Sequence, residues 1–189
     1  MHVYDFDNTI YDGESVFDFF LFCIGKKPSY LKYLPLMLRK LLRYKRCKMS
    51  IEELTKSAER VAYQMFQKAD CLEEWVAEFW DRRERRIKSF YRAQQREDDL
   101  VITASPGFLM REIFRRIGVR NFICSEIDPR TGKLEFLCYH KNKAKVFLER
   151  FQNAKIEEFY TDSRNDQPMI DLAEKAFLVC GKQIERIKP

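Results

Sequence analysis

The chain has 189 residues, of which 46% are hydrophobic, and its formal net charge is +6. This length suits one domain, or one domain with a sizeable insertion, and the composition supports a substantial core. Only 6 Gly and 6 Pro argue against a disordered chain, and the basic excess leaves open an anionic partner: a phosphorylated metabolite, a lipid headgroup or nucleic acid.

The six cysteines are scattered without a Cys-x-x-Cys pair, and the chain has only two histidines. This spacing predicts neither a zinc site nor a secreted disulfide framework, so we expect reduced cysteines in a cytoplasm. Asp5 and Asp7 stand where a signal peptide needs an apolar segment. No stretch reaches the roughly 18 apolar residues of a membrane-spanning helix. A cytoplasmic protein is therefore expected.

The first predicted element is a short buried strand over residues 2–6, followed by a polar loop over 8–14. The stretch "VYDFDNTI" places Asp5 and Asp7 two residues apart. Because a strand sends alternate residues to opposite faces, both carboxylates should point the same way. Two explanations fit: a strand end running into a turn, where Asp and Asn are common, or a site for a hard cation and a phosphate.

Residues 15–95 have helical patterns throughout. The predicted segments are 15–25, 28–46, 50–68 and 70–95. The second is basic and aromatic and is interrupted by Pro35, and the third begins with a capping box of Ser50 and Glu53. The fourth is long and strongly charged. Consecutive helical segments of this kind predict an inserted helical bundle.

After Asp98, short apolar strands alternate with helices. The predicted order is a strand in "DLVITASP", a helix over 107–118, a strand and hairpin within 119–138 turned at Arg130–Gly132, a helix over 141–151, a strand and loop over 156–166, and a last strand over 175–181. This alternation predicts an α/β fold whose parallel sheet is covered on both faces. Ligands of such sheets bind outside the carboxyl ends of the strands.

Polar side chains follow strands that should be neighbours in this sheet. They are Asp5, Asp7 and Thr9; Thr103 and Ser105; Lys143; and Asp162 and Asp166. Magnesium takes oxygen ligands, with one or two carboxylates beside water and a substrate phosphate, and Asp5 and Asp162 would meet that need. Without a cation these carboxylates would repel one another. The coincidence favours a metal site over ordinary strand ends.

This ordered set resembles the haloacid dehalogenase superfamily of phosphatases. The family's Asp-x-Asp-x-Thr motif stands here as "DFDNT", its strand ending in Thr or Ser as "VITAS", and its acidic pair as "DSRND" after a helix that carries lysine. The resemblance spans essentially the whole chain. It implies a Rossmann-like core domain formed by residues 1–13 and 96–189, with a helical cap domain, 14–95, inserted after the first strand.

The resemblance also implies a magnesium-dependent phosphatase that hydrolyses a phosphate monoester. Asp5 would be the nucleophile that forms an aspartyl-phosphate, and Asp7 would act as general acid and base. Mg²⁺ would bind the carboxylates of Asp5 and Asp162 and the backbone carbonyl of Asp7, with Asp166 supporting or completing the shell. Thr103 would hydrogen-bond a phosphoryl oxygen.

The phosphate-binding lysine lies among Lys141, Lys143 and Lys145, and Lys143 best matches the family's spacing. Alternatively, all three belong to a solvated helix start. Ser105 and Pro106 are predicted as the N-cap and first residue of the following helix. The free amide groups there could also bind a phosphate.

The position of the expected cap places the chain in the phosphoserine-phosphatase-like branch. Glu14 matches a glutamate that phosphoserine phosphatases use near the substrate's amino group, or it only favours the start of the first cap helix. At the second motif those enzymes carry Ser-Gly-Gly-Phe, whereas this chain has residues 103–106, "TASP". Phosphoserine is therefore not the expected substrate.

The forms "ITASP" and "DSRNDQPM" and the basic, apolar first half of the cap look similar to bacterial phosphatidylglycerophosphate phosphatases. The basic segment over 26–46 could lie at the inner face of a membrane as a peripheral contact. Alternatively, its apolar residues pack inside the cap while its basic side chains are solvated. The expected partner is a small phosphorylated substrate, either a metabolite or a lipid phosphate.

Two other functions stay open. A covalent intermediate also permits a phosphotransferase that uses an acceptor other than water. The charged run "DRRERRIKSFYRAQQR" suggests another alternative, a protein that has lost its catalytic activity and binds lipid or nucleic acid. Against the second, every catalytic position holds a competent residue, and the charged run carries its own acids. Nucleic acid is therefore not an expected partner.

Overall fold

The computed structural model describes residues 1–45, 60, 61, 63–65 and 71–188. The helix predicted over 50–68, with its capping box at Ser50 and Glu53, lies outside this range except at residues 60, 61 and 63–65, which are helical. None of the helices in the described ranges is both long and apolar enough to cross a membrane.

Within the described ranges, the sheet has seven strands in the order β4-β3-β2-β1-β5-β6-β7. Their bounds are β1 His2–Tyr4, β2 Leu100–Pro106, β3 Asn121–Ile127, β4 Leu134–Phe136, β5 Ile156–Thr161, β6 Ala173–Cys180 and β7 Gln183–Lys188. The central strands are parallel, and only the edge strands β4 and β7 pair antiparallel. The predicted α/β fold with a Rossmann-like parallel sheet is confirmed.

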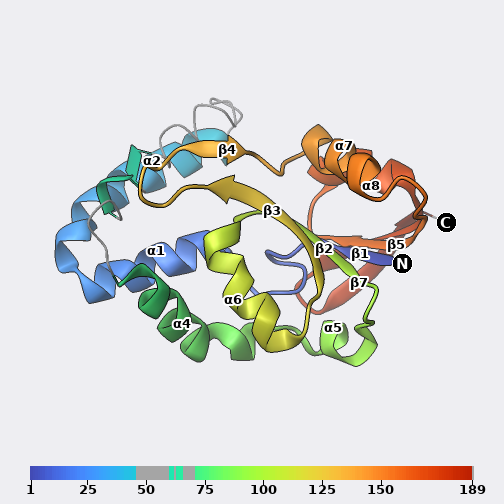
Figure 1. Ribbon diagram of the computed structural model, residues 1–189, viewed down its shortest axis with the longest axis horizontal. Coiled ribbons are helices and arrows are strands. Elements are labelled where there is room, and N and C mark those ends of the chain that lie inside the picture. Colours follow the sequence, from blue (N-terminus) through green and yellow to red (C-terminus); the bar gives the residue numbers. More distant parts are fainter. Residues whose placement is uncertain (46–59, 62, 66–70, 189) are drawn as a thin grey trace.

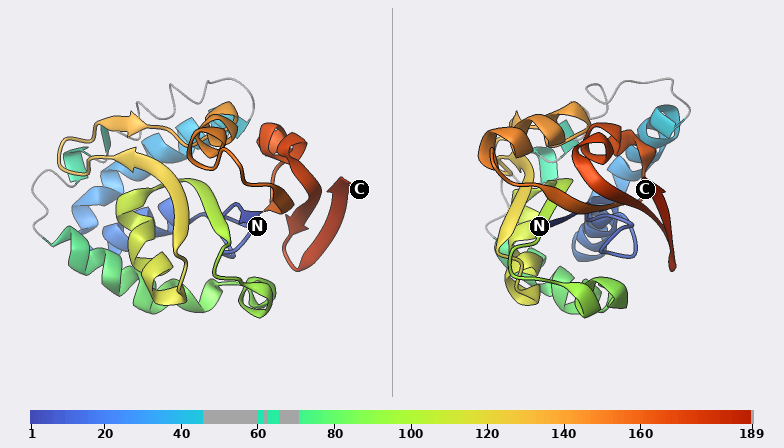
Figure 2. Two further views of the ribbon diagram at one scale, coloured as in Figure 1. Left: turned by 45° about the vertical axis from the view of Figure 1, so that its right-hand side comes forward. Right: turned by 90° about the vertical axis from the view of Figure 1, so that its right-hand side faces the viewer.

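Helices cover both faces of the sheet. They are α1 Ser15–Lys26, η1 Pro28–Tyr33, α2 Leu34–Lys45, α4 Leu72–Arg83, η2 Glu84–Arg86, α5 Ser89–Gln94, α6 Gly107–Ile117, α7 Lys141–Arg150, η3 Arg164–Asp166 and α8 Gln167–Leu172. Figure 1 shows α4, α5 and α6 on one side of the sheet and α7 and α8 on the other. In the left view of Figure 2, the blue helix α1 lies on the side of the molecule opposite β7 and the C-terminus.

The two faces of the sheet carry separate apolar cores. Tyr4 and Val101 belong to the core shared with α1, α4 and α6, whereas Val3 and Leu100 belong to the core shared with α7 and α8. Neighbouring residues of one strand therefore fill opposite cores, as the two-residue period of a strand requires. This is the burial on both faces that parallel sheets need.

The segment predicted as one helix over 70–95 is broken, which corrects that prediction. The chain leaves the helix at Ile87, whose backbone is extended and whose side chain is buried. Here the backbone pairs with the loop after β1: the Lys88 N–H donates to the Ile10 carbonyl at 2.8 Å, and the Asp12 N–H donates to the Arg86 carbonyl at 2.9 Å. Hydrogen bonds to the loop after β1 therefore interrupt the predicted helix at this point.

Beyond this break, α5 packs on the core sheet. Tyr91 makes an edge-on contact with Tyr4 of β1 at 5.0 Å between ring centroids, and the Gln94 side-chain amide donates to the Tyr4 hydroxyl at 3.0 Å. The last helix of the expected cap thus lies against β1. The division into a core and a cap over residues 14–95 stays a proposal.

Other elements differ from prediction at their ends. The first strand ends at Tyr4 instead of residue 6, and α8 and β7 were not predicted. The predicted hairpin between β3 and β4 is present, with Gly132 at φ 68° in its turn. Strand β7 follows β6 through a tight turn in which Gly181 has φ 60°, a conformation that glycine adopts without strain.

Candidate active site

Asp5 and Asp7 lie just beyond the end of β1, in a tight loop. The N–H groups of Ile10 and Tyr11 both donate to the Phe6 carbonyl at 2.9 Å, which closes the loop. Asn8 has φ 56°, a left-handed conformation that asparagine tolerates better than most residues. The carboxylates are therefore presented by a loop that the carboxyl end of a buried strand holds in place, rather than by the strand itself.

A buried lysine binds two carboxylates at this end of the sheet. Lys143 Nζ lies 2.8 Å from Asp5 Oδ1 and 2.9 Å from Asp166 Oδ2, and all three side chains are buried. Burial disfavours the ammonium, but the two carboxylates outweigh it and raise the pKa of Lys143. Lys141 and Lys145 are both exposed on α7. Of the three candidate lysines, only Lys143 reaches the predicted acids.

The cluster carries more negative than positive charge. Burial raises the pKa of Asp5 to about 8, and the charges of Asp166 and Asp162 add to the rise, while the Lys143 ammonium opposes it. One ammonium therefore does not balance the carboxylates gathered around it. Such a site stabilises a further cation.

Asp7 has different surroundings. The Ser105 hydroxyl donates to Asp7 Oδ2 at 2.5 Å, and the Ser15 backbone N–H donates to Asp7 Oδ1 at 2.7 Å. The two serine hydroxyls lie 3.0 Å apart. Burial raises the pKa of Asp7 to about 6, although these hydrogen bonds lower it. A carboxyl group with a pKa near neutrality suits general acid–base chemistry.

Ser105 is not the N-cap of the next helix, so that prediction was wrong. Strand β2 continues through Pro106, which itself occupies the N-cap position, and α6 begins at Gly107. The extended backbone turns the Ser105 hydroxyl toward Asp7 instead. Thr103 is buried beneath it, and its hydroxyl oxygen accepts the Ser105 N–H at 3.1 Å.

The second acidic pair follows β5. The Thr161 hydroxyl donates to Asp166 Oδ2 at 2.9 Å, the same oxygen that Lys143 contacts. Asp162 is half-buried, and its pKa is raised by burial and by the charges of Glu14 and Asp166, against the side chains of Asn8 and Lys143. Asp162 thus lies within the electrostatic reach of the groups around Asp5.

Glu14 lies at the rim of the site. It occupies the N-cap position of α1 without a side-chain capping hydrogen bond, and its side chain is exposed. The Asn8 side-chain amide donates to Glu14 Oε1 at 3.0 Å. The exposed carboxylate is therefore held beside the loop that carries Asp7.

The donor set fits a magnesium ion through its chemistry. In the described part of the chain, no three His, Cys, Asp or Glu side chains form a group that could hold a metal ion by themselves. Asp5 and Asp162 nevertheless offer carboxylate oxygens, and burial, together with the charges of neighbouring carboxylates, raises the pKa of both. Magnesium is bound by one or two carboxylates with water and phosphate oxygens completing its shell. Such an ion needs no closed group of protein side chains.

A model of the haloacid dehalogenase-like hydrolases matches residues 2–171 of this chain. The chain belongs to this family. The sequence-based prediction of the superfamily, and of a hydrolase, is confirmed. Among curated proteins, no sequence matches the chain closely enough to count as a relative.

Several solved structures share the fold of this chain. A protein of unknown function from Bordetella pertussis Tohama I is similar with a TM-score of 0.73 and 19% identity, over 90% of this chain and 85% of its own. A HAD family hydrolase from Salmonella enterica serovar Typhi has a TM-score of 0.62 and 15% identity, over 90% of this chain and 59% of its own. A phosphoserine phosphatase, solved as a phospho-aspartyl intermediate analogue, is similar with a TM-score of 0.59 and 15% identity, over 92% of this chain and 83% of its own.

Three polar residues of the candidate site were missed in the sequence. The Ser15 amide holds Asp7, the Thr161 hydroxyl holds Asp166, and the Lys88 ammonium donates to the Asn8 carbonyl. Burial lowers the pKa of Lys88. Lys88 lies in a charged run and Ser15 at a helix start, so the pattern around each indicates only an ordinary surface or capping residue. Thr161 could have been found from its place one residue before the acidic pair.

Proposed function

We propose that the chain is a magnesium-dependent phosphatase that hydrolyses a phosphate monoester through an aspartyl-phosphate. One observation carries the proposal: Asp5 is paired with a buried lysine, whereas Asp7 is held separately by a hydroxyl and an amide. Two nearby carboxyl groups in different environments can take different chemical roles. The phospho-aspartyl state of a phosphoserine phosphatase with the same fold supports the assignment.

In the proposed reaction, a carboxylate oxygen of Asp5 attacks phosphorus. The new O–P bond forms as the bond to the leaving alcohol breaks, and Asp7 gives its proton to the leaving oxygen. Asp7 then takes a proton from the water that cleaves the aspartyl-phosphate, which releases phosphate and restores Asp5. The hydrogen bonds from Ser105 and Ser15 hold Asp7 in one orientation through both steps.

Charge neutralisation comes from the groups around Asp5. Magnesium, held by the Asp5 and Asp162 carboxylates and the Asp7 backbone carbonyl with Asp166 in support, would stabilise negative charge on the phosphoryl oxygens. Lys143 lies against Asp5 and Asp166 and lets an anionic nucleophile approach an anionic substrate. Thr103 is proposed to hydrogen-bond a phosphoryl oxygen.

The substrate is proposed to be a small phosphate ester that the helices between residues 14 and 95 help to select. Glu14 is exposed at the rim of the site, where it can contact the part of the substrate beyond the phosphate. A screen of phosphorylated metabolites and lipid phosphates, each with and without magnesium, would identify the ester.

Asp5→Asn tests the proposed nucleophile. An amide cannot form the phosphorylated intermediate, so turnover of an aryl phosphate should fall below detection while the circular dichroism spectrum stays unchanged. Asp98→Asn is the matched control, since Asp98 is exposed, and it should retain wild-type turnover. Undiminished turnover in the folded Asp5→Asn variant would rule out the assignment.

A further inference from the structure

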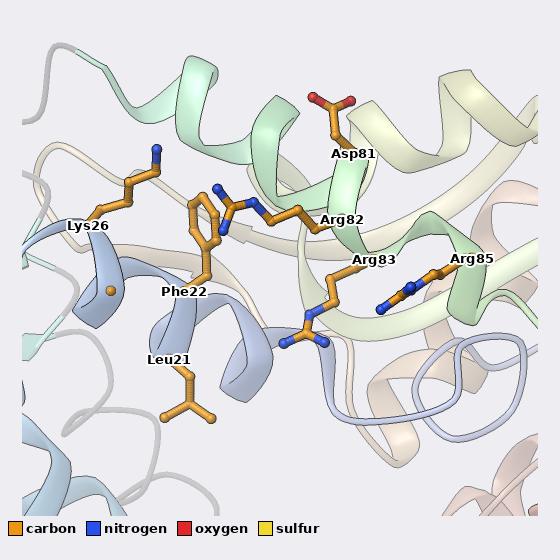
Figure 3. A pocket seen from close by; sticks show the side chains of 8 residues that line it. Leu21, Phe22, Lys26, Asp81, Arg82, Arg83 and Arg85 are labelled. Carbon is orange, nitrogen blue, oxygen red and sulfur yellow. The ribbon is translucent and has the colours of Figure 1, made fainter.

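A groove of about 820 Å³ lies between α1 and the wall formed by α4 and η2 (Figure 3). Its lining residues are Leu21, Phe22, Gly25, Lys26, Asp81, Arg82, Arg83 and Arg85. None of them belongs to the candidate active site. The volume falls within the range of sites for small organic molecules.

The lining of the groove is strongly cationic. Its only acid, Asp81, is bound by Arg116 at 2.7 Å and points away from the arginines in Figure 3. Arg83 and Arg85 both line the groove, and among the described residues neither pairs with a carboxylate; in Figure 3 the Arg85 side chain extends in the direction of Arg83. Two such groups repel unless an anion lies between them. The guanidinium fork matches the oxygens of a phosphate.

The opposite part of the groove is apolar and already ordered. Lys26 and Arg82 both pair with Glu78 and lie 5.5 and 5.4 Å from the centroid of the Phe22 ring. Their charges are partly satisfied, and they hold Phe22 in place. Leu21, the preceding residue of α1, also lines the groove and is 39% exposed. A ligand that fits the groove therefore combines an anionic group with an apolar body.

Gly25 keeps the groove open. A Cβ atom added there would meet no atom within 4 Å, so packing does not require glycine at this helical position. Because Gly25 lines the groove, a large side chain at this position would fill part of it.

We propose that this groove binds a small soluble organic phosphate, at a site separate from the candidate active site. Its phosphate binds Arg83 and Arg85, and its apolar body lies along Phe22. The size of the groove favours a small molecule over a membrane surface. Binding requires neither Asp5 nor magnesium, so the inference stands apart from the proposed phosphatase activity.

Phenylphosphonate is the probe, because it joins a phosphonate to an aromatic ring and carries no ester bond to hydrolyse. It is titrated calorimetrically into the protein in buffer with a metal chelator. Saturable binding is expected to weaken at least tenfold in the double variant Arg83→Ser/Arg85→Ser and in Gly25→Phe. Gly25→Ala, Asp5→Asn and Arg130→Ser, a change of an exposed arginine elsewhere, should bind within twofold of wild type.

Circular dichroism confirms the fold of each variant, and Gly25→Ala separates effects on the helix from filling of the groove. Absence of saturable binding to the wild-type protein would overturn the proposal. So would binding that Asp5→Asn removes and the arginine variants retain, since that places the probe at the active site.

Vesicles of phosphatidylglycerol provide a second experiment. Binding to these vesicles that depends on Arg83 and Arg85, without binding of phenylphosphonate, would assign the groove to a lipid surface instead.

Discussion

At the scale of single residues, Asp5 and Asp7 are close in sequence but differ in what they contact. Asp5 faces an ammonium and other carboxylates, and Asp7 faces a hydroxyl and an amide. Burial raises the pKa of Asp5, and the charges of Asp166 and Asp162 add to the rise against the opposing effect of Lys143. A bound cation would restore the anionic form that a nucleophile needs, whereas Asp7 already titrates near neutrality.

Replacing Ser105 should affect turnover more than substrate binding. Ser105→Ala removes the 2.5 Å hydrogen bond to Asp7. A hydrogen bond to a charged group contributes about 1.5–3 kcal/mol, which corresponds to roughly 10- to 100-fold in kcat. Steady-state kinetics on an aryl phosphate should show this loss with KM changed less than about threefold. Ser105→Thr, which keeps the hydroxyl, should recover part of it, and an unchanged kcat in Ser105→Ala would contradict the positioning role.

Asp99 is a buried carboxylate outside the site. Its Oδ2 accepts the Arg96 N–H at 2.8 Å, but Oδ1 has no hydrogen-bond partner among the described residues. Burial raises the pKa of Asp99 above its ordinary value. The folded state therefore holds this proton more tightly than the unfolded state does. The free energy of unfolding accordingly falls as pH rises from the ordinary range of a carboxyl group through the raised pKa.

Asp99→Asn should therefore stabilise the protein at pH 7. The gain should be about 1 kcal/mol, the low end of the cost of an unpaired buried polar group. It should shrink in acid, where the wild-type carboxyl is protonated in both states. Urea denaturation at pH 7 and pH 3 measures both values, with Glu174→Gln, a change of an exposed carboxylate, as the control. A variant less stable than wild type at pH 7 would show that the charge is satisfied in the fold.

At the scale of elements, α4 is fastened to α6 behind the active-site loop. The indole N–H of Trp80 donates to the Leu109 carbonyl at 2.7 Å, and its ring packs edge-on against Phe6 and Tyr11. Arg116 of α6 also donates to the Ala77 carbonyl of α4 at 3.0 Å. The loop that carries Asp5 and Asp7 therefore packs against a helix pair that the buried indole and Arg116 hold together.

Truncating this indole should destabilise the whole protein. Trp80→Ala leaves a cavity among fully buried rings and should lower the free energy of unfolding by about 3–5 kcal/mol. Trp80→Phe keeps most of the packing and loses mainly the hydrogen bond, so about 1 kcal/mol is expected. Urea denaturation compares the two. A loss below 1 kcal/mol in Trp80→Ala would mean that α4 contributes little to the core.

The sequence predicted the end of an element where a single residue, such as a glycine, determines the backbone conformation. Gly118 ends α6 at φ 75°, as the glycine indicated. The break at Ile87 was not predictable, because it depends on pairing with the distant loop at Ile10 and Tyr11. Strand β7 was missed because its charged residues gave no apolar run, although Gly181 marked its turn.

At the scale of the molecule, the topology explains why the predicted acids meet. Strand β1 pairs with β2 on one side and with β5 on the other, so the ends of three strands distant in sequence lie together. The motif order therefore predicted where Asp5, Thr103 and Asp162 would gather. The contacts of Ser105 and Ser15 with Asp7 were not predictable, because they depend on side-chain direction at the end of β2 and the start of α1.

Because of the charge at this meeting point, we expect the stability of the protein to depend on the proposed magnesium ion. Carboxylates from β1 and β5 outnumber the one buried ammonium, and a bound ion would relieve their repulsion only in the folded state. A ligand at 100 times its Kd stabilises a fold by about 2.7 kcal/mol. For a chain of this size, this is a rise in Tm of roughly 5–10 °C. Scanning calorimetry with magnesium and with a chelator measures the rise, and the chelator should also abolish turnover.

Asp162→Asn separates the ion's effect on the fold from a general salt effect. The variant lacks one proposed metal ligand, so its Tm should change little between magnesium and chelator, whereas Asp98→Asn should keep the wild-type rise. In the absence of magnesium, Asp162→Asn should be at least as stable as wild type, because it removes one of the repelling charges that raise the pKa of Asp5. A rise that persists in Asp162→Asn would place the ion elsewhere in the molecule, and no rise in the wild-type protein would show that Lys143 alone balances the cluster.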